Sequence, residues 1–463
     1  MKSISIFGTS SDAGKSTLTF VIGRLLQERG ITVAPFKAQN VSNNSRVAED
    51  GSEIAIAQYF QAEVLGVPTS CHLNPVLLKS GRGNGANLIV KGKPVGDKEV
   101  RDYYRDLVTL KPAVDECFSY LATRYDCVIC EGAGSPVELN LMDKDLSNIY
   151  IAERYDTKII LVADIEKGGV FASIWGVYNL LPESLRANVV GVIVNKFRGD
   201  LSLFDEGVRI IEERFGIPVL GVLPYMSLNL GFEDSASLFN YAQHREGSKL
   251  SIGVIAYPTM SNYNDIEPLI LDEEVHVEFV RGDMGLDSFD LVLLPGSKRT
   301  VEDLRWLKQT GLFERLKRRE KPVYGICGGY QMMFDALRDP EGIESAVPDT
   351  EEGLGWIDDE IVWQREKILR RGRYDLFGTQ VEGFEIRHGA SVKNLLSFEK
   401  GNIRGSFVHG VFEDDSFRTR ILRTLDQGYI GYHFTQRKKE ILGRFIDECR
   451  QRIDMERIVR HVV

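Results

Sequence analysis

The stretch FGTSSDAGKSTL occupies residues 7–18, where the apolar run KSISIFG gives way to the helix-like STLTFVIGRLLQERG. A glycine-rich turn between a strand and a helix gathers backbone N–H groups at a helix N-terminus, where phosphate binds. We therefore interpret the stretch as a phosphate loop for ATP, in which Lys15 would reach the terminal phosphates and the Ser16 hydroxyl would bind Mg²⁺. An ordinary turn with a surface lysine is disfavoured by the strand–loop–helix context. The predicted nucleotide contacts here are Gly8, Thr9, Asp12, Gly14, Lys15, Ser16 and Thr17.

Length and composition are those of a globular chain. The 463 residues exceed what one core usually holds, so two or three domains are expected. The net charge of -10 argues against non-specific binding to nucleic acid or to an anionic membrane. We see no apolar run of membrane-spanning length and no signal-peptide pattern at the start. The 6 scattered cysteines suit a reducing compartment, so a cytoplasmic location is expected.

Strand-like and helix-like stretches alternate along the chain. The apolar runs YDCVICEG, TKIILVAD, NVVGVIVN and IPVLGVLP are typical of strands covered on both faces, which predicts a mainly parallel α/β sheet. The chain turns polar near residue 240, and LSIGVIAYP then begins a second α/β series. We predict a phosphate-loop NTPase-like domain at residues 1–240, a linker at 241–250, and a flavodoxin-like domain at 251–463 that ends in a helical tail.

The second half contains a candidate nucleophile. KPVYGICGGYQMM reads as a strand, a sharp turn and a helix, with Cys327 at the turn. Such a turn exposes the side chain above the sheet, and the helix N-terminus favours a thiolate. The backbone of Gly328 and of the PGSK turn (Gly296, Ser297) would form an oxyanion hole, and His409 in FVHGVF would be the base. The alternative is a buried structural cysteine and a strand histidine, which the glycines of the turn disfavour.

Two other patterns receive structural interpretations. Cys127 and Cys130 form a Cys-x-x-Cys pair, but YDCVICE reads as a strand, in which residues three apart point to opposite faces. We expect both to pack in the core. SGRGNGANL, at residues 80–88, resembles a dinucleotide loop only loosely, because no strand–helix unit surrounds it. We interpret it as a mobile loop beside the substrate.

The phosphate loop has five residues between its glycines, at positions 9–13, where the usual pattern has four. This longer loop resembles that of the dethiobiotin synthetase branch of phosphate-loop proteins. FKAQNVSNNS, NPVLLKS, CEGAGSPVELNL, ADIEKGGVFAS and GVIVNKFRGD then follow in the order expected of the cobyric acid synthase family. The second half adds PGSKRTVEDL, GICGGYQMM, GFEIRHG and VHGVF, so the resemblance covers most of the chain.

This resemblance implies a glutamine-hydrolysing, ATP-dependent amide ligase whose second domain is similar to class I glutamine amidotransferases. The implied substrate is adenosylcobyrinic acid a,c-diamide, whose b, d, e and g carboxylates would be amidated to give adenosylcobyric acid in cobalamin biosynthesis. ATP would convert each carboxylate into an acyl phosphate, a step that needs mainly positioning and charge neutralisation. Glutamine would supply the ammonia.

Residues outside the phosphate loop complete the expected synthetase site. Lys37 would neutralise phosphate charge, and Glu131, which follows an apolar strand, suits a carboxylate ligand of Mg²⁺. By family resemblance Asp50 is a second candidate metal ligand, with a solvated turn as the alternative. Related nucleotide enzymes imply that Asn195 reads adenine. Asp164 ends a strand before a glycine pair and is a candidate for contacting magnesium or substrate.

The second half departs from class I glutamine amidotransferases in two places. Those enzymes carry a Glu two residues after the histidine, where this chain has Val411, so what orients His409 is left open. The family usually has His directly after Glu-Ile, whereas here Arg387 precedes His388, so no role is assigned to His388. Glu385 is a candidate for contacting glutamine or for supporting the site.

Two rival functions are kept. The sister enzyme cobyrinic acid a,c-diamide synthase is disfavoured by FKAQNVSNNS. A regulatory phosphate-loop ATPase fused to an inactive amidotransferase-like module is disfavoured by the intact Cys327 and His409. The expected partners are small molecules rather than nucleic acid or membrane. The sequence leaves open whether the chain forms a homodimer, the order of amidation and the path of ammonia.

Overall fold

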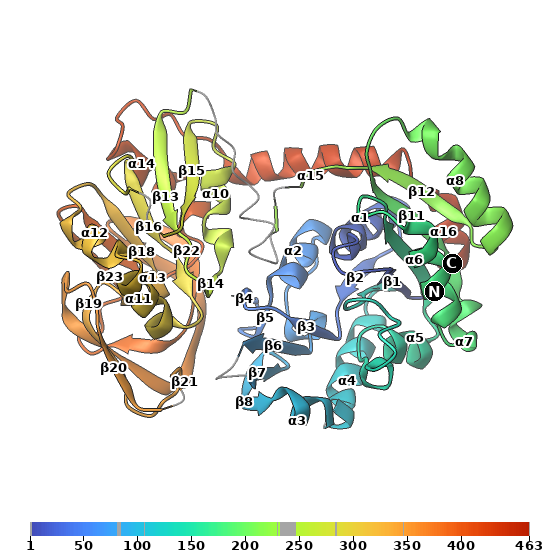
Figure 1. The fold of residues 1–463 in the computed structure, drawn as a ribbon, viewed down its shortest axis with the longest axis horizontal. Coiled ribbons are helices and arrows are strands. Elements are labelled where there is room, and N and C mark those ends of the chain that lie inside the picture. The colour runs from blue at the N-terminus through green and yellow to red at the C-terminus, as the bar shows by residue number, and fades with distance from the viewer. Residues whose placement is uncertain are drawn as a thin grey trace.

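The computed structural model describes residues 2–80, 85–105, 107–228, 230–231, 247–282, 285–345 and 347–462. The chain forms two lobes, one blue to green and one yellow to orange, with a red helix running between them (Figure 1). Each lobe contains a six-stranded, mainly parallel sheet. The predicted two-domain α/β class is therefore confirmed.

The first domain is built on a parallel sheet of strand order β12-β11-β10-β1-β9-β2. The four apolar runs that predicted buried strands form four of its six strands. In that order the strands are Val219–Pro224, Val189–Phe197, Lys158–Asp164, Ile4–Gly8, Cys127–Glu131 and Val33–Phe36. Helices pack around the sheet: α1 (Lys15–Gln27), α2 (Ile56–Leu65), α4 (Lys111–Ala122), α5 (Ile149–Tyr155), α6 (Val170–Leu180), α7 (Glu183–Arg186) and α8 (Asp205–Arg209).

Two small sheets lie on the side of the first domain that faces the second. One has the order β3-β6-β7-β8, with strands Gln39–Val41, Val76–Ser80, Gly85–Val90 and Lys93–Glu99, followed by α3 (Val100–Arg105). The other pairs β4 (Ser45–Val47) with β5 (Glu53–Ala55). Residues 85–88, expected to be loop, are thus strand, because β7 pairs with both β6 and β8. Residues 81–84 of that expected loop lie outside the described residues.

The second domain has the strand order β15-β13-β16-β18-β24-β23. Its strands are Val275–Val280, Leu250–Ile255, Leu291–Leu294, Val323–Ile326, Ile403–Ser406 and Ser397–Lys400. A second sheet, which the sequence reading missed, contains β20 (Asp349–Glu352), β19 (Phe334–Asp339), and the long hairpin of β21 (Ile357–Leu376) and β22 (Thr379–Ser391). The helices are α10 (Glu267–Ile270), α11 (Thr300–Gln309), α12 (Leu312–Arg318), α13 (Gly328–Gln331) and α14 (Asp415–Arg423).

The C-terminal helices return to the first domain. Helix α15 (Phe434–Arg450) crosses from one lobe to the other, and α16 (Met455–Val462) ends beside the N-terminus (Figure 1). Their buried side chains belong to the first domain's core, and the backbone N–H of Lys2 donates to Val462 O at 2.8 Å. This differs from the expected division, which gave the tail to the second domain, because the apolar face of these helices is buried against α1, β11 and β12. Of the expected linker 241–250, residues 241–246 lie outside the described residues.

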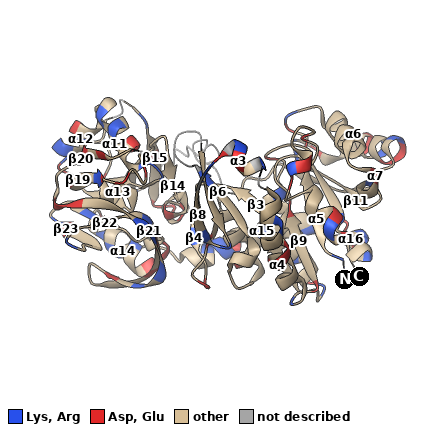
Figure 2. Cartoon of the chain, turned by 90° about the horizontal axis from the view of Figure 1, so that it is seen from below, with Lys and Arg blue, Asp and Glu red and all other residues tan. Residues whose placement is uncertain are grey.

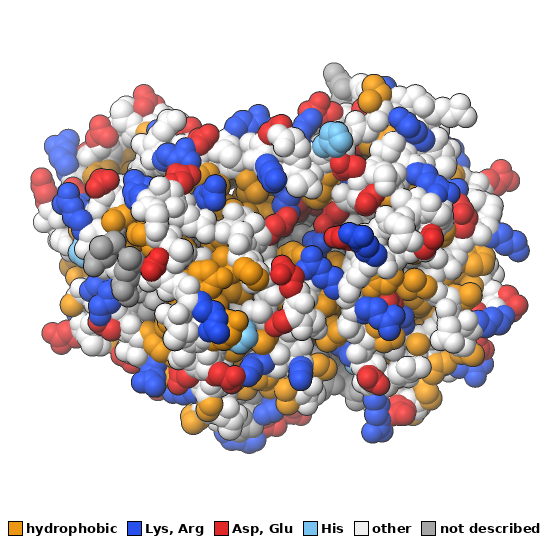
Figure 3. Space-filling model, turned by 180° about the vertical axis from the view of Figure 1, so that it is seen from behind, with side chains coloured by type: hydrophobic (Ala, Val, Ile, Leu, Met, Phe, Trp, Pro, Cys, Tyr) orange, Lys and Arg blue, Asp and Glu red, His pale blue; other side chains and the backbone are white. Residues whose placement is uncertain are grey.

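The surface carries both charges. Basic and acidic residues are interspersed over the elements of both lobes (Figure 2). In the space-filling view the outline narrows where the lobes meet, and side chains of both signs lie near this junction (Figure 3). Among the described residues, no helix combines the length and apolar character needed to cross a bilayer.

Candidate active sites

The phosphate loop joins β1 to α1, as predicted. Lys15 is buried, with 8% of its surface exposed, and its Nζ is 3.3 Å from Ser10 O. A Cβ at Gly8 would lie 2.6 Å from that Nζ and 2.7 Å from the backbone oxygen of Ser10, so a larger residue there would displace both. Gly14 has a φ of 104°, which favours glycine, and is the N-cap residue directly before α1. Thr9 N donates to Val162 O at 2.9 Å, which fixes the loop to β10.

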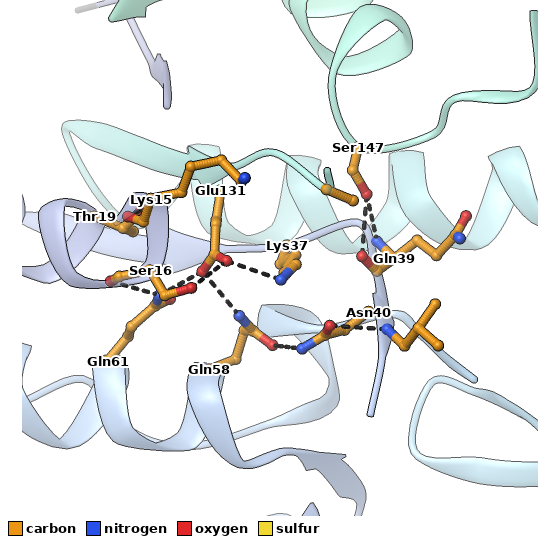
Figure 4. Close-up of polar contacts among 12 residues, drawn as sticks. Lys15, Ser16, Thr19, Lys37, Gln39, Asn40, Gln58, Gln61, Glu131 and Ser147 are labelled. Atoms are coloured by element: carbon orange, nitrogen blue, oxygen red, sulfur yellow. Dashed lines mark hydrogen bonds and ion pairs between the residues drawn. The ribbon is translucent and has the colours of Figure 1, made fainter. Parts of the chain in front are cut away.

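Glu131 is the centre of a buried network at the end of β9 (Figure 4). Its Oε1 accepts hydrogen bonds from Ser16 Oγ at 2.6 Å and from Lys37 Nζ at 2.8 Å. Its Oε2 accepts from Gln61 Nε2 at 2.6 Å and from Gln58 Nε2 at 3.3 Å. Burial would raise the pKa of Glu131, but Lys37 and the hydrogen bonds outweigh it and hold the pKa below its usual range. The carboxylate is therefore ionised near neutral pH.

The donor set around Glu131 fits Mg²⁺. A carboxylate and a hydroxyl at the phosphate loop are the oxygen ligands that Mg²⁺ takes alongside nucleotide phosphates. Gln61 Oε1 is also buried there, without a hydrogen bond among the described residues. Ser16 and Glu131 would hold the ion, and Lys37, only 6% exposed, would add positive charge next to it.

Asn195 and Asp164 lie against the phosphate loop on neighbouring strands, in register with each other. Asn195 Nδ2 donates to Ala13 O at 2.9 Å, so in this structure the side chain braces the loop. Asp164 accepts from Lys196 Nζ at 3.0 Å, and Lys196 also donates to Asp12 O at 2.6 Å. The structure thus brings both residues to the loop, and adenine recognition by Asn195 stays a prediction.

Asp50 lies in a different cluster. Its Oδ1 accepts from Ser52 N and its Oδ2 from Cys71 N, both at 3.0 Å. Asp50, Cys71 and His72 offer ligand atoms within 4.8 Å of one another, but the His72 ring stacks on Tyr120 with centroids 3.7 Å apart. Among the described residues, the contacts of Asp50 lead here rather than to Ser16 or Glu131. A role for Asp50 as a magnesium ligand stays a prediction.

The Cys-x-x-Cys pair is buried in the sheet of the first domain. Cys127 and Cys130 both lie in β9, with about 1% of each exposed. Burial raises the pKa of Cys127 to about 12 and that of Cys130 well above its usual range. Both thiols are therefore protonated near neutral pH, as suits core residues.

Cys327 sits on the predicted sharp turn between β18 and α13, with φ 48° and ψ -102°. Such a backbone costs on the order of 1–3 kcal/mol in a residue other than glycine and tends to occur at functional sites. A Cβ at Gly328 would lie 2.6 Å from Ser297 N, and one at Gly296 would lie 3.1 Å from His409 Cε1. The structure therefore brings together five of the six residues predicted for the glutamine site: Cys327, His409, Gly296, Ser297 and Gly328.

Asp265 is the acidic partner of His409, which the sequence did not identify. Its Oδ2 is 2.7 Å from His409 Nδ1, and its Oδ1 accepts from Gly410 N at 2.6 Å. Burial lowers the pKa of His409, but Asp265 and Cys327 together outweigh burial and raise it to about 10. Asp265 precedes His409 by 144 residues in the short helix η6 (Tyr263–Asp265), so no local spacing pointed to it.

Strand β22 passes beside this site. Phe384 pairs with His409 through two backbone hydrogen bonds, and Ile386 O is 3.8 Å from Cys327 Sγ. Glu385, between them, has the opposite orientation and pairs with Arg387 at 2.6 Å. Burial, with Lys367 nearby, lowers the pKa of His388 to about 4. Binding of glutamine by Glu385 stays a prediction.

Comparison with known proteins covers both lobes. A family model described as the CobQ/CobB/MinD/ParA nucleotide binding domain matches residues 4–230, and one described as a CobB/CobQ-like glutamine amidotransferase domain matches residues 251–417. The cobyric acid synthase of Acinetobacter baylyi is 63% identical over 462 residues, covering 100% of this chain and 99% of that protein. A probable cobyric acid synthase of Methanothermobacter thermautotrophicus is 40% identical, covering 91% and 90%. A cobyric acid synthase of Clostridium botulinum is 37% identical, covering 99% of both.

Proposed function

The chain belongs to the cobyric acid synthase family, and from this premise we propose that it amidates the b, d, e and g carboxylates of adenosylcobyrinic acid a,c-diamide. Each carboxylate would be activated by ATP and then attacked by ammonia from glutamine. The observation that carries the proposal is the arrangement of Cys327, His409 and Asp265 in the same chain as a phosphate loop whose Ser16 contacts Glu131.

The second domain would release ammonia. The Cys327 sulfur would attack the glutamine amide carbon while His409 takes the thiol proton and returns it to the leaving ammonia. N–H groups of Gly328 and Ser297 would stabilise the oxyanion, and water would then hydrolyse the thioester to glutamate. Asp265 would orient the His409 imidazole so that Nδ1–H faces the carboxylate and Nε2 is free to face the sulfur.

The first domain would activate the carboxylate. Lys15 and Lys37 would neutralise the charge that develops on the transferred phosphoryl group. Ser16 and Glu131 would hold Mg²⁺, which would supply positive charge to the nucleotide phosphates. Ammonia would then displace phosphate from the acyl phosphate and leave the amide.

A pair of variants tests this division of work. Cys327→Ala should lose corrinoid amidation from glutamine and keep it from ammonium chloride, whereas Lys15→Ala should lose both, because both nitrogen sources need the acyl phosphate. Mass spectrometry of the corrinoid counts the amides formed with each nitrogen source. Glutamine use by Cys327→Ala, or normal ammonium-dependent turnover by Lys15→Ala, would refute the assignment of the corresponding site.

A further inference from the structure

Three consecutive residues of the first domain contact the second domain beside its glutamine site. Asn44 Oδ1 accepts from Asn262 N at 2.7 Å, and Ser45 N donates to Asn262 Oδ1 at 3.2 Å. Arg46 donates to both carboxylate oxygens of Glu413, at 2.7 and 2.8 Å. Asn44 and Asn262 are both buried. The first domain therefore fixes the position of Asn262 through two hydrogen bonds.

The amide of Asn262 reaches the catalytic histidine. Because Ser45 N–H must point at an acceptor, Oδ1 faces Ser45 and the NH₂ group is left to face His409, with Nδ2 3.3 Å from Nε2. An amide NH₂ can only donate, so this contact binds the lone pair of Nε2 and favours the neutral imidazole, in opposition to Asp265 and Cys327, which favour the imidazolium. The thiol proton of Cys327 needs the same lone pair. Asn262 and Cys327 therefore compete for one atom of His409.

We propose that Asn262 is a positioning residue that restrains His409 Nε2, and that the first domain controls this restraint through Asn44 and Ser45. The inference rests on the proposed function, since it concerns release of ammonia for the synthetase. While Asn262 donates to Nε2, formation of the Cys327 thiolate is disfavoured. When residues 44–45 withdraw, Nε2 turns fully to the thiol and glutamine is hydrolysed.

The same segment begins at the nucleotide site. Lys37 donates to Glu131, and Asn40 Nδ2 donates to Gln58 Oε1 at 2.9 Å, which in turn contacts Glu131. Mg²⁺ bound at Glu131 would compete with these donors for the carboxylate oxygens. Residues 37–45 thus connect the ATP site with Asn262 through one short stretch of backbone, a physical route by which the two sites can be coupled.

The backbone of Asn262 allows a clean test. It has φ 56° and ψ 46°, a left-handed conformation that glycine adopts without strain. Asn262→Gly should remove the amide and keep the fold of residues 260–265. Asn44→Ala perturbs the same contact from the other domain, outside the glutamine site. Asn394→Gly is the matched control, because Asn394 has φ 60° and lies exposed in the second domain.

The first measurement is glutamate release with and without Mg-ATP and corrinoid. Without them, Asn262→Gly and Asn44→Ala should raise kcat about three- to tenfold, the worth of one hydrogen bond, with the KM for glutamine unchanged. With Mg-ATP and corrinoid present, the kcat of both variants should stay near that of wild type. The factor by which these ligands stimulate glutamine hydrolysis should therefore be smaller in the variants. Asn394→Gly should behave as wild type. A merely structural role would lower kcat under both conditions.

The second measurement is alkylation of Cys327 by iodoacetamide, followed by mass spectrometry of its peptide. Both variants should react faster than wild type in the absence of ATP, because the thiolate forms more readily. Unchanged basal hydrolysis and alkylation in both variants would overturn the inference, as would a wild-type chain that ATP and corrinoid do not stimulate. Failure of the wild-type protein to amidate the corrinoid from ammonium chloride would instead contradict the proposed function.

Discussion

Asp265 Oδ2 lies 2.7 Å from Nδ1 of His409. The position two residues after His409, where class I glutamine amidotransferases carry the acidic partner of the histidine, is Val411. Asp265 and His409 are 2% and 1% exposed, so the contact is shielded from water. The carboxylate accepts a hydrogen bond from Nδ1–H and thereby leaves Nε2 as the basic atom. This geometry is that of a catalytic triad whose third member comes from a distant part of the chain.

Asp265→Asn should therefore disable glutamine use. An amide can hold the imidazole in the wrong tautomer, and in triads this change costs about 10²–10⁴ in turnover. Ammonium-dependent amidation should stay near wild type, because it bypasses His409. The measurement is corrin amide formed per minute with each nitrogen source. Glutamine-dependent activity within twofold of wild type would show that Asp265 is dispensable.

Glu131→Gln should raise the magnesium requirement. A neutral amide holds a hard cation less well than a carboxylate, so we expect the Mg²⁺ concentration for half-maximal rate to rise about tenfold or more. Lys37 would also lose its buried counter-ion, which lies 2.8 Å away. A magnesium titration of ammonium-dependent amidation measures the effect without involving the glutamine site. An unchanged titration would mean that the carboxylate is structural.

Local patterns in the sequence were enough to predict the parts of the fold that depend on short spacings. The phosphate loop, the apolar parallel strands and the turn at Cys327 each carry their signal within about a dozen residues. The closeness of Ser16 and Glu131 is also predictable from the sequence, because the carboxyl ends of neighbouring parallel strands meet at one edge of a sheet.

What the sequence could not predict depends on contacts between distant segments. Asp265 comes near His409 only through the packing of η6 against the turn that follows β24. The hairpin of β21 and β22 was missed because 10 of the 20 residues of β21 are charged, which weakens the apolar alternation expected of a strand. The return of α15 and α16 to the first domain depends on which core has room for their apolar faces, and helical periodicity does not contain that information.

Glu267 gives a pH-dependent prediction. Its side chain is 3% exposed, Oε2 accepts from Gly231 N at 2.9 Å, and burial raises its pKa to about 7. Because the folded-state pKa exceeds the unfolded value of about 4.5, the protonated acid contributes stability that is complete below pH 4.5. That contribution is lost as the pH rises through 7. Glu267→Gln should therefore match wild type near pH 5 and be more stable by about 1–3 kcal/mol at pH 8.5.

Urea unfolding at the two pH values measures this difference. Glutamine keeps an oxygen that can accept from Gly231 N, so the hydrogen bond is preserved. The exposed Glu456→Gln serves as control and should show the same pH dependence as wild type. A Glu267→Gln protein that is equally destabilised at both pH values would show that the ionised carboxylate is favourable in the fold, stabilised by the positive charge of Lys438.

Ile458 tests whether the C-terminal helices are part of the first domain's core. Its side chain lies on α16 and is 1% exposed. Just before this helix, the backbone N–H of Asp454 donates to Leu220 O on β12 at 2.7 Å. Ile458→Ala should cost about 2–5 kcal/mol, because the cavity opens among side chains of the first sheet. Calorimetry with and without Mg-ATP identifies the unfolding transition of the nucleotide domain as the one whose midpoint temperature ATP raises. The midpoint of that transition should fall in Ile458→Ala. Leu304 is buried in the core of the second domain, so Leu304→Ala should lower the midpoint of the other transition. If Ile458→Ala lowered the ATP-insensitive transition alone, the tail would belong energetically to the second domain.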